Sequence, residues 1–302
     1  MFEVIRQNKM KTGIYVALSF SLLSAVIYFL AWYWGDFGVG GALMVAVIFS
    51  SISTIISYWN SDKIILRITK AHPANETDNK KVINAMEGLC IASGLPMPKV
   101  YIIDDDSMNA FATGRNPKHA VVCVTRGLLD RLDYYQLEGV LAHELGHIRN
   151  YDILLSTVVT VLVGMIVMLS HLFLRWGFRG RRGKDSNSSN AIIMIVGLIL
   201  IILAPIFSQI LKFTISRKRE FMADATAVEF TRNPEGLASA LELISTDSAV
   251  ECADPATASM FIAEPQAMNF GTRERRNARK RAGLFDTHPL ISERIKAIRE
   301  IH

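Results

Sequence analysis

The stretch "LAHELGHIRN", Leu141–Asn150, contains two histidines and a glutamate in the pattern H-E-x-x-H. Residues four apart lie on one face of a helix, so His143 and His147 can direct their imidazoles at a single ion. Glu144 lies one step around the helix, close to that ion but free of it. Neutral imidazoles suit zinc, and a carboxylate beside an open coordination position can take a proton from water. The motif therefore predicts a catalytic zinc site.

The residues around the motif favour a helix. Apolar side chains recur at spacings of three and four, at Leu137, Val140, Leu141, Leu145 and Ile148. We therefore expect a helix over Asp130–Arg149 with both histidines on one face. The alternative is a surface helix on which the histidines are incidental, and this alternative leaves the complete H-E-x-x-H pattern without a role.

A third metal ligand is expected downstream of the motif, because catalytic zinc usually keeps three protein ligands and one open position. The segment "SRKREFMADATAVEF" places Glu220 and Asp224 four residues apart, on one face of a helix. Glu220 could bind zinc, and Asp224 could accept a hydrogen bond from the second nitrogen of a ligating histidine. Glu229 is the alternative ligand on this segment. The upstream cluster Asp104–Asp106 is expected in a solvated turn.

Four windows without a charged residue indicate a membrane protein. They are Thr12–Gly35, Phe37–Ser61, Ile153–Leu174 and Ser186–Leu211. Each contains an apolar stretch of about 20 residues, which is long enough to cross a bilayer as a helix. The first window is too long for a signal peptide and is followed at once by the second, so we interpret it as a retained anchor. A cytosolic deformylase with the same motif is excluded.

These windows divide the chain into four parts. Residues 1–61 are expected to form an N-terminal transmembrane hairpin, and residues 152–211 a second one. Residues 62–151 and 212–302 are the two halves of a protease domain, and the first half carries the H-E-x-x-H helix. In this half "DNKKVINAMEGLCIASGL" is typical of an amphipathic helix, and "KVYIID", "NAFATG" and "HAVVCVT" are typical of short strands. The expected fold is mainly α, with four hydrophobic helices and an α+β domain that has a small sheet.

The distribution of basic residues predicts the orientation in the membrane. Lysines and arginines flank the first hairpin but are absent from its connecting loop, which places both ends of the hairpin in the cytoplasm. The loop of the second hairpin is basic, which conflicts with this rule. Either earlier charges determine the topology and the second hairpin spans the membrane, or this hairpin inserts only in part. We favour a spanning hairpin. A net charge of +5 is small for a nucleic-acid binder, and anionic lipids are the expected partner.

Four segments together resemble the HtpX membrane zinc proteases, relatives of the CAAX prenyl proteases. They are "LAHELGHIRNYD", "KREFMADATAVEF", "MNAFATG" and "THPLISERIKAI". The resemblance implies a gluzincin-type fold, one zinc ion per subunit held by His143, His147 and Glu220, and Glu144 as the catalytic base. It also implies a bacterial cytoplasmic (inner) membrane and a role in the stress response. Leu290 departs from the pattern, because relatives often carry a second proline after "THP", and this leaves the local turn geometry open.

The resemblance also suggests residues that contact the substrate. "NAFATG" resembles a strand at the edge of a cleft, where Asn109, Ala110 and Phe111 can pair with an extended peptide through main-chain hydrogen bonds. His288 resembles a histidine that stabilises the oxyanion in related folds, with Arg294 assisting. The alternative for His288 is a structural role at the start of a helix whose first residue is Pro289.

The expected function is that of a multi-pass membrane zinc metalloendopeptidase. It would cleave misfolded or damaged membrane proteins at the cytoplasmic face, because the motif directly precedes a membrane segment. Its partners would be unfolded polypeptides and the lipid bilayer, not nucleic acid. One alternative is a prenyl-protein-type processing peptidase, although four segments are too few to enclose the large chamber of such enzymes. Another is a non-catalytic zinc-dependent membrane regulator, which would not need Glu144.

Overall fold

The structure is a computed structural model that describes residues 2–34, 38–161, 217–246, 262 and 289–301. The fourth apolar window, most of the third, the basic loop between them and His288 lie outside the described residues. Of the four expected hydrophobic helices, two of membrane length are described. The described part of the third window belongs to a shorter apolar helix, Asp152–Val161.

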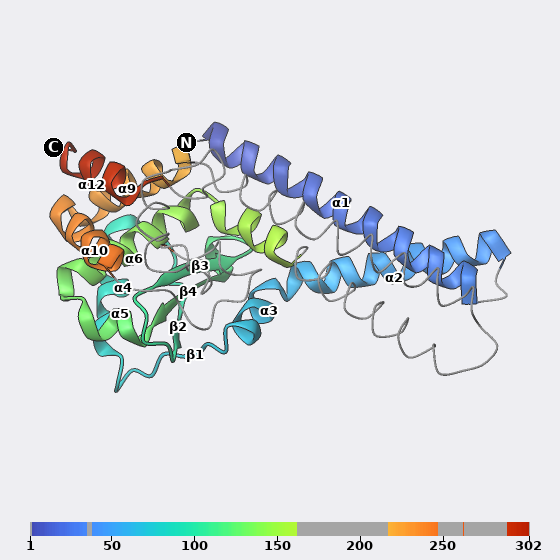
Figure 1. The fold of residues 1–302 in the computed structure, drawn as a ribbon, viewed down its shortest axis with the longest axis horizontal. Helices are drawn as coiled ribbons and strands as arrows, with labels where there is room; N and C mark the ends of the chain where they lie inside the picture. The colour runs from blue at the N-terminus through green and yellow to red at the C-terminus, as the bar shows by residue number, and fades with distance from the viewer. Residues whose placement is uncertain (1, 35–37, 162–216, 247–261, 263–288, 302) are drawn as a thin grey trace, which may run out of the picture.

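The two long helices, α1 (Phe2–Trp34) and α2 (Gly38–Trp59), form an antiparallel hairpin that projects from the rest of the protein (Figure 1). Their apolar segments are 25 and 22 residues long, enough to cross a bilayer. Small residues allow the two helices to approach closely, as is common between membrane helices. Ala42 and Ala46 of α2 are buried, and the hydroxyl oxygens of Ser24 and Ser50 lie 2.6 Å apart.

A four-stranded sheet forms the centre of the remaining protein. Its strands lie in the order β1 (His72–Pro73), β2 (Lys99–Ile103), β4 (Ala120–Thr125) and β3 (Ala110–Gly114). β2 and β4 are parallel, whereas β1 and β3 run antiparallel to their neighbours. The three strands expected from the sequence are confirmed, while β1, with two residues, was not predicted. β3 is an edge strand.

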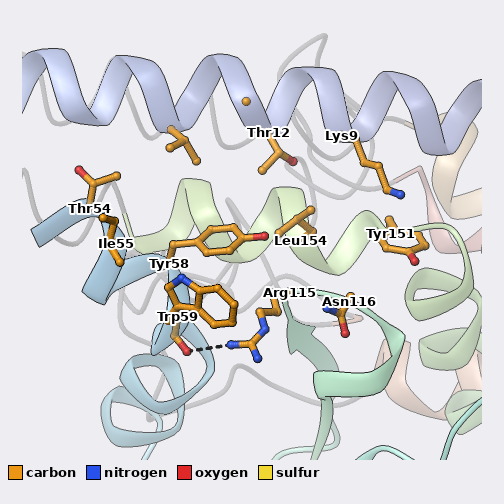
Figure 2. A pocket seen from close by; sticks show the side chains of 12 residues that line it. Lys9, Thr12, Thr54, Ile55, Tyr58, Trp59, Arg115, Asn116, Tyr151 and Leu154 are labelled. Atoms are coloured by element: carbon orange, nitrogen blue, oxygen red, sulfur yellow. Dashed lines mark hydrogen bonds between the residues drawn. The ribbon is translucent and has the colours of Figure 1, made fainter. Parts of the chain in front are cut away.

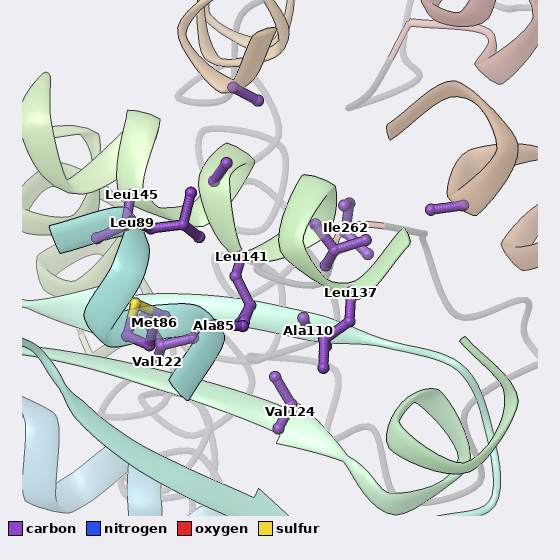
Figure 3. Packing of buried hydrophobic residues seen from close by; sticks show 14 of the residues in the cluster. Ala85, Met86, Leu89, Ala110, Val122, Val124, Leu137, Leu141, Leu145 and Ile262 are labelled. Atoms are coloured by element: carbon purple, nitrogen blue, oxygen red, sulfur yellow. The ribbon is translucent and has the colours of Figure 1, made fainter. Parts of the chain in front are cut away.

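Helices cover both faces of this sheet. Successive side chains of a strand point to opposite faces, and every residue of β3 and β4 is buried. α4 (Lys80–Ser93) and α6 (Tyr134–Arg149) cover one face, and their side chains pack against alternate residues of the strands (Figure 3). α3 (Ser61–Ile68), which follows α2 directly, covers the other face. The sheet therefore lies between the helix that carries the motif and the end of the membrane hairpin.

The single helix expected over Asp130–Arg149 is two helices, so this prediction was wrong in its start. The first helix, α5, covers Arg126–Arg131, and a separate helix, α6, begins at Tyr134. Asp133 caps α6: its carboxylate accepts a hydrogen bond from the backbone of Gln136 (2.9 Å), and the Gln136 side chain accepts one from the backbone of Asp133 (3.0 Å). This reciprocal cap fixes a new helix start inside a continuous apolar pattern.

α9 (Arg217–Thr231) and α10 (Pro234–Thr246) pack on α6, and α12 (Ile291–Arg299) packs on α10 and α9 (Figure 1). A glycine on α6 permits the approach of α9. A Cβ at Gly146 would lie 3.1 Å from the Cα of Ala223, closer than side chains usually come. The backbones of α6 and α9 are therefore near enough for short side chains to meet between them.

Candidate active site

Two histidines of α6 and a glutamate of α9 converge between these helices. His143, His147 and Glu220 each offer a ligand atom, and the three atoms lie within 4.8 Å of one another. The two Nε2 atoms are 3.1 Å apart, and the Glu220 carboxylate oxygens lie 3.6 Å from His147 Nε2 and 3.8 Å from His143 Nε2. Two imidazole nitrogens and one carboxylate are a donor set typical of catalytic zinc, so these residues fit a metal ion.

The second nitrogen of each histidine contacts a carboxylate. His143 Nδ1 lies 2.9 Å from Asp224 Oδ1, and His147 Nδ1 lies 3.0 Å from Asp152 Oδ2. A carboxylate on Nδ1 places the proton there and leaves Nε2 as the free nitrogen. Both rings are therefore held with Nε2 directed at Glu220.

Arg294 of α12 is completely buried behind the metal ligands. Its Nε and Nη2 atoms donate to the two carboxylate oxygens of Asp224, at 2.9 and 2.7 Å, and its Nη1 lies 3.4 Å from Glu220 Oε2. Burial alone would raise the pKa of Asp224, but the charge of Arg294 and the hydrogen bond with His143 outweigh it and lower this pKa to about 2. Asp224 is therefore an ionised partner for His143.

The partner of His147, Asp152, is held by residues from distant parts of the chain. The amide of Asn8, on α1, donates to Asp152 Oδ1 (2.7 Å) and to the backbone carbonyl of Asn150 (3.1 Å). Arg219 Nη1 lies 3.5 Å from Asp152 Oδ1. The membrane hairpin, the end of α6 and the start of α9 thus meet at one carboxylate.

A sharp turn brings Asp152 back to His147. α6 ends at Arg149, and Tyr151 adopts the left-handed conformation with φ +60°, which is uncommon for a residue with a large side chain. The turn reverses the chain so that Asp152, five residues after His147, reaches the histidine's outer nitrogen. Burial lowers the pKa of His147, but the hydrogen bond with Asp152 and the charge of Glu220 outweigh this effect and raise the pKa to about 9.

Glu144 lies between the two histidines in sequence and faces the sheet. Its side chain is buried, and the backbone N–H of Ala112 on β3 donates a hydrogen bond to its carboxylate. Burial raises the pKa of Glu144, and this effect exceeds the opposing influence of the two histidines. A buried carboxyl with a raised pKa lies beside the metal ligands and beside the edge strand.

Comparison with known proteins agrees with this arrangement. Residues 76–302 match peptidase family M48. The chain belongs to this family. Three M48 relatives, each called "Protease HtpX homolog", are similar to it over nearly their whole length. The relative from Caldanaerobacter subterraneus subsp. tengcongensis is 43% identical over 100% of this chain and 98% of its own. The relative from Dictyoglomus thermophilum is 43% identical over 99% and 94%, and that from Listeria monocytogenes serotype 4b is 41% identical over 99% and 99%.

The resemblance to the HtpX membrane proteases is therefore confirmed, and the protein is an M48 metalloprotease with membrane helices. A solved structure, "Crystal Structure of S. mikatae Ste24p", is 17% identical with a TM-score of 0.48, over 99% of this chain and 67% of that one. A similarity of this size does not establish a common fold by itself.

The other residues considered as metal ligands in this M48 chain lie apart from the cluster. Glu229 is exposed on α9, where its carboxylate lies 3.1 Å from Arg149 Nη1. Asp104 is exposed as well, in ion pairs with His72 and Arg126. Both carboxylates have surface partners, as expected for solvated acidic residues. Asp105 of the Asp104–Asp106 cluster departs from this expectation, because it is buried and accepts a hydrogen bond from the backbone of Ser107 (2.9 Å).

The residues expected to contact substrate have different surroundings. Asn109, Ala110 and Phe111, at the start of β3, have side chains that are at most 1% exposed, so a peptide could reach them only through the backbone. The carbonyl of Ala110 accepts a hydrogen bond from the backbone of Ile262 (3.0 Å). Arg294 is buried against Asp224, a partner that the sequence did not predict.

Proposed function

We propose that this M48 protein is a zinc metalloendopeptidase. The observation that carries the proposal is the cluster of His143, His147 and Glu220, with ligand atoms within 4.8 Å, beside the buried carboxyl of Glu144. Zinc held by these three residues would supply a Lewis acid that lowers the pKa of water to about 7. Among the metals that are common in hydrolases, zinc is the one that best suits this set of donor atoms.

Glu144 is the general base in this proposal. It takes a proton from the water that attacks the scissile carbonyl carbon, and it then gives this proton to the nitrogen of the leaving amine as the C–N bond breaks. A carboxyl is most effective in both steps when its pKa lies near neutral pH, and burial raises the pKa of Glu144 in that direction. The hydrogen bond from the backbone of Ala112 keeps the carboxylate beside β3.

The remaining charged groups position the ligands. Asp224 orients His143, and Arg294 holds Asp224 by two hydrogen bonds. Asp152 orients His147 in the same way. We therefore assign Arg294 a positioning role behind the ligands. His288 remains our candidate for stabilising the oxyanion, and it lies outside the described residues.

The substrate is proposed to be an extended segment of a misfolded or damaged membrane protein. β3 is the edge strand beside α6, and an extended peptide could pair with it by taking the place of Ile262, whose N–H now bonds the Ala110 carbonyl. The contact of Asn8 with Asp152 ties the membrane hairpin to the ligands, which supports a reaction close to the membrane surface. Such a site suits segments that emerge from the bilayer.

We further propose that residues 62–151 and 212–302 form one protease domain on the cytoplasmic side of a bacterial inner membrane, with hairpins at 1–61 and 152–211. The packing of α9 on α6 supports one domain built from both halves. Labelling of Lys118→Cys and Glu235→Cys in intact cells tests on which side of the membrane the two halves lie. If both halves are cytoplasmic, both positions are protected from an impermeant maleimide. Labelling of either one from outside contradicts this orientation.

A test of the catalytic proposal uses the full-length protein in detergent, stripped with a chelator. Zinc should restore cleavage of an unfolded membrane protein by the wild type. Glu144→Gln should bind zinc normally, but its rate of cleavage should fall by at least the factor of 10²–10⁴ that is typical of one acid–base group. Rapid cleavage by zinc-loaded Glu144→Gln would refute the base assignment, and cleavage by metal-free wild type would refute the metal mechanism.

A further inference from the structure

A cavity of about 630 Å³ lies where the membrane hairpin meets the rest of the protein (Figure 2). α1 and α2 line one side, while the turn after β3 and the residues after α6 line the other. None of the lining residues is a metal ligand or contacts one, so the cavity is separate from the candidate active site. Its volume is within the range of small-molecule sites.

The charged residues that line this cavity are both cations, Lys9 and Arg115. Arg115 is held in place: its guanidinium carbon lies 4.2 Å from the centroid of the Trp59 ring, and its Nη1 donates to the Trp59 carbonyl (3.3 Å). Lys9 Nζ lies 4.4 Å from the centroid of the Tyr151 ring. Within the described part of the chain, neither cation has a carboxylate partner. The cavity therefore favours an anion.

The cavity lies at the level where the apolar part of the hairpin ends. The apolar segment of α2 ends at Trp59, and the charge-free run of α1 begins at Thr12, one turn after Lys9. Tyr58 and Trp59 are aromatic residues of the kind that gather at the boundary between headgroups and acyl chains. In a hairpin that spans a bilayer, this boundary would place the two cations near the depth of lipid phosphates.

On the membrane side the cavity is lined by apolar groups. Val16, Ile55 and Leu154 line it there. The hydroxyl of Thr54 is buried and has no hydrogen-bond partner among the described residues. Thr54 lies one residue before Ile55 on α2, at the apolar end of the cavity.

We propose that this cavity binds an anionic phospholipid. The phosphate lies between Lys9 and Arg115, and an acyl chain follows Val16 and Ile55 into the bilayer. A free inorganic anion would use only the cationic end and leave the apolar end unfilled. A lipid bound here joins α1, α2 and the turn after β3, next to Asn8.

The test uses the full-length Glu144→Gln protein in detergent, which removes self-cleavage. Dioleoyl phosphatidylglycerol should raise the melting temperature in a saturable way, since a ligand of the native state stabilises it by mass action. Dioleoyl phosphatidylcholine has the same chains without net charge, and sodium phosphate has the charge without chains. Neither should match the phosphatidylglycerol effect at equal concentration. Equal binding of phosphatidylcholine, or a phosphate effect as large, overturns the proposal.

Matched variants locate the site. Lys9→Ala/Arg115→Ala removes the two cavity cations, and Lys63→Ala/Lys118→Ala removes two exposed lysines nearby that do not line it. Native mass spectrometry should show phosphatidylglycerol affinity about 25-fold weaker in the first pair, from roughly fivefold for each cation, and close to wild type in the second. Equal losses in both pairs mean a general surface attraction and overturn the site.

A second variant guards against misfolding of the first pair. Arg115→Gln removes the charge but keeps a donor for the Trp59 carbonyl, and Arg115→Lys keeps the charge. The proposal requires weaker phosphatidylglycerol binding in Arg115→Gln than in Arg115→Lys, with equal melting temperatures in the absence of lipid. Indistinguishable affinities in these two variants contradict it.

Discussion

Glu220 and Glu229 lie on the same helix, α9, but in opposite surroundings. Glu220 is 2% exposed and lies beside both histidines, whereas Glu229 is exposed and paired with Arg149. Glu220→Ala removes the one anionic ligand, so zinc should bind poorly and activity should vanish. Glu229→Ala is the matched control and should keep both. Metal content of the purified variants, measured by mass spectrometry, decides between them; full zinc in Glu220→Ala would mean that the wrong carboxylate was chosen.

The sequence was sufficient for part of this site. The spacing within H-E-x-x-H depends only on local helix geometry, so His143 and His147 could be proposed without a structure. The choice of Glu220 over Glu229 rested on its interval from Asp224 and on the family resemblance together. Asp152 could not be identified as a partner of His147 from spacing alone, because their contact requires the left-handed turn at Tyr151. A carboxylate just past the end of a metal-binding helix is the signal that could have identified it.

A comparison of Arg294 with Arg299 measures how much a buried arginine charge contributes to stability and to zinc binding. Both are on α12 and both bind a carboxylate through two nitrogens, but Arg294 is fully buried, whereas Arg299 lies at the surface with Glu235. Arg294→Met leaves the buried charge of Asp224 with His143 as its remaining partner, which should lower the free energy of unfolding by about 3–5 kcal/mol and weaken zinc binding. Arg299→Met should do neither. Urea unfolding and zinc titration of both variants test this, and equal effects would contradict it.

At the scale of elements, the approach of α9 to α6 controls whether the ligands meet. A Cβ at Gly146 would lie 3.1 Å from Ala223 Cα and 3.2 Å from its carbonyl oxygen, whereas a Cβ at Gly88, on α4, would meet nothing within 4 Å. Gly146→Ala should therefore force the helices apart, destabilise the protein by about 1–3 kcal/mol and weaken zinc binding. Gly88→Ala should stabilise it by about 0.5–1 kcal/mol, because alanine favours a helix.

Thermal unfolding with and without zinc compares these two glycine variants. The decisive quantity is the zinc-dependent shift of the melting temperature, which should shrink in Gly146→Ala and stay unchanged in Gly88→Ala. A full zinc shift in Gly146→Ala would show that α9 tolerates the extra methyl group without moving Glu220.

Elements with a local signature were predictable, and those defined by partners were not. β2, β3, β4 and α4 follow alternation and amphipathic spacing that the sequence displays. The start of α6 was missed because a cap, not the apolar pattern, sets it. β1 is too short to show a pattern at all. The packing of α9 on α6 and of α12 on α9 depends on contacts between residues 70 or more positions apart, for which a single sequence holds no direct signal.

At the scale of the whole molecule, one hydrogen bond connects the membrane hairpin to the metal ligands. Asn8, 3% exposed on α1, donates to Asp152, which in turn binds the outer nitrogen of His147. The two residues are 144 positions apart, so this contact could not be seen in the sequence. The arrangement of the metal ligands should therefore depend on the position of α1.

Removing this connection should therefore weaken the metal site without touching a ligand. Asn8→Ala deletes two hydrogen bonds, one of them to a charged group, and should lower the free energy of unfolding by about 1–3 kcal/mol. Zinc should bind about 10-fold more weakly, at the lower end of the range for partners of ligating residues. Ser24→Ala, which removes a hydrogen bond between α1 and α2, is the control and should leave zinc affinity unchanged. Competition with a fluorescent chelator measures both variants. Wild-type zinc affinity in Asn8→Ala would mean that Arg219 alone holds Asp152 and that α1 has no influence on the ligands.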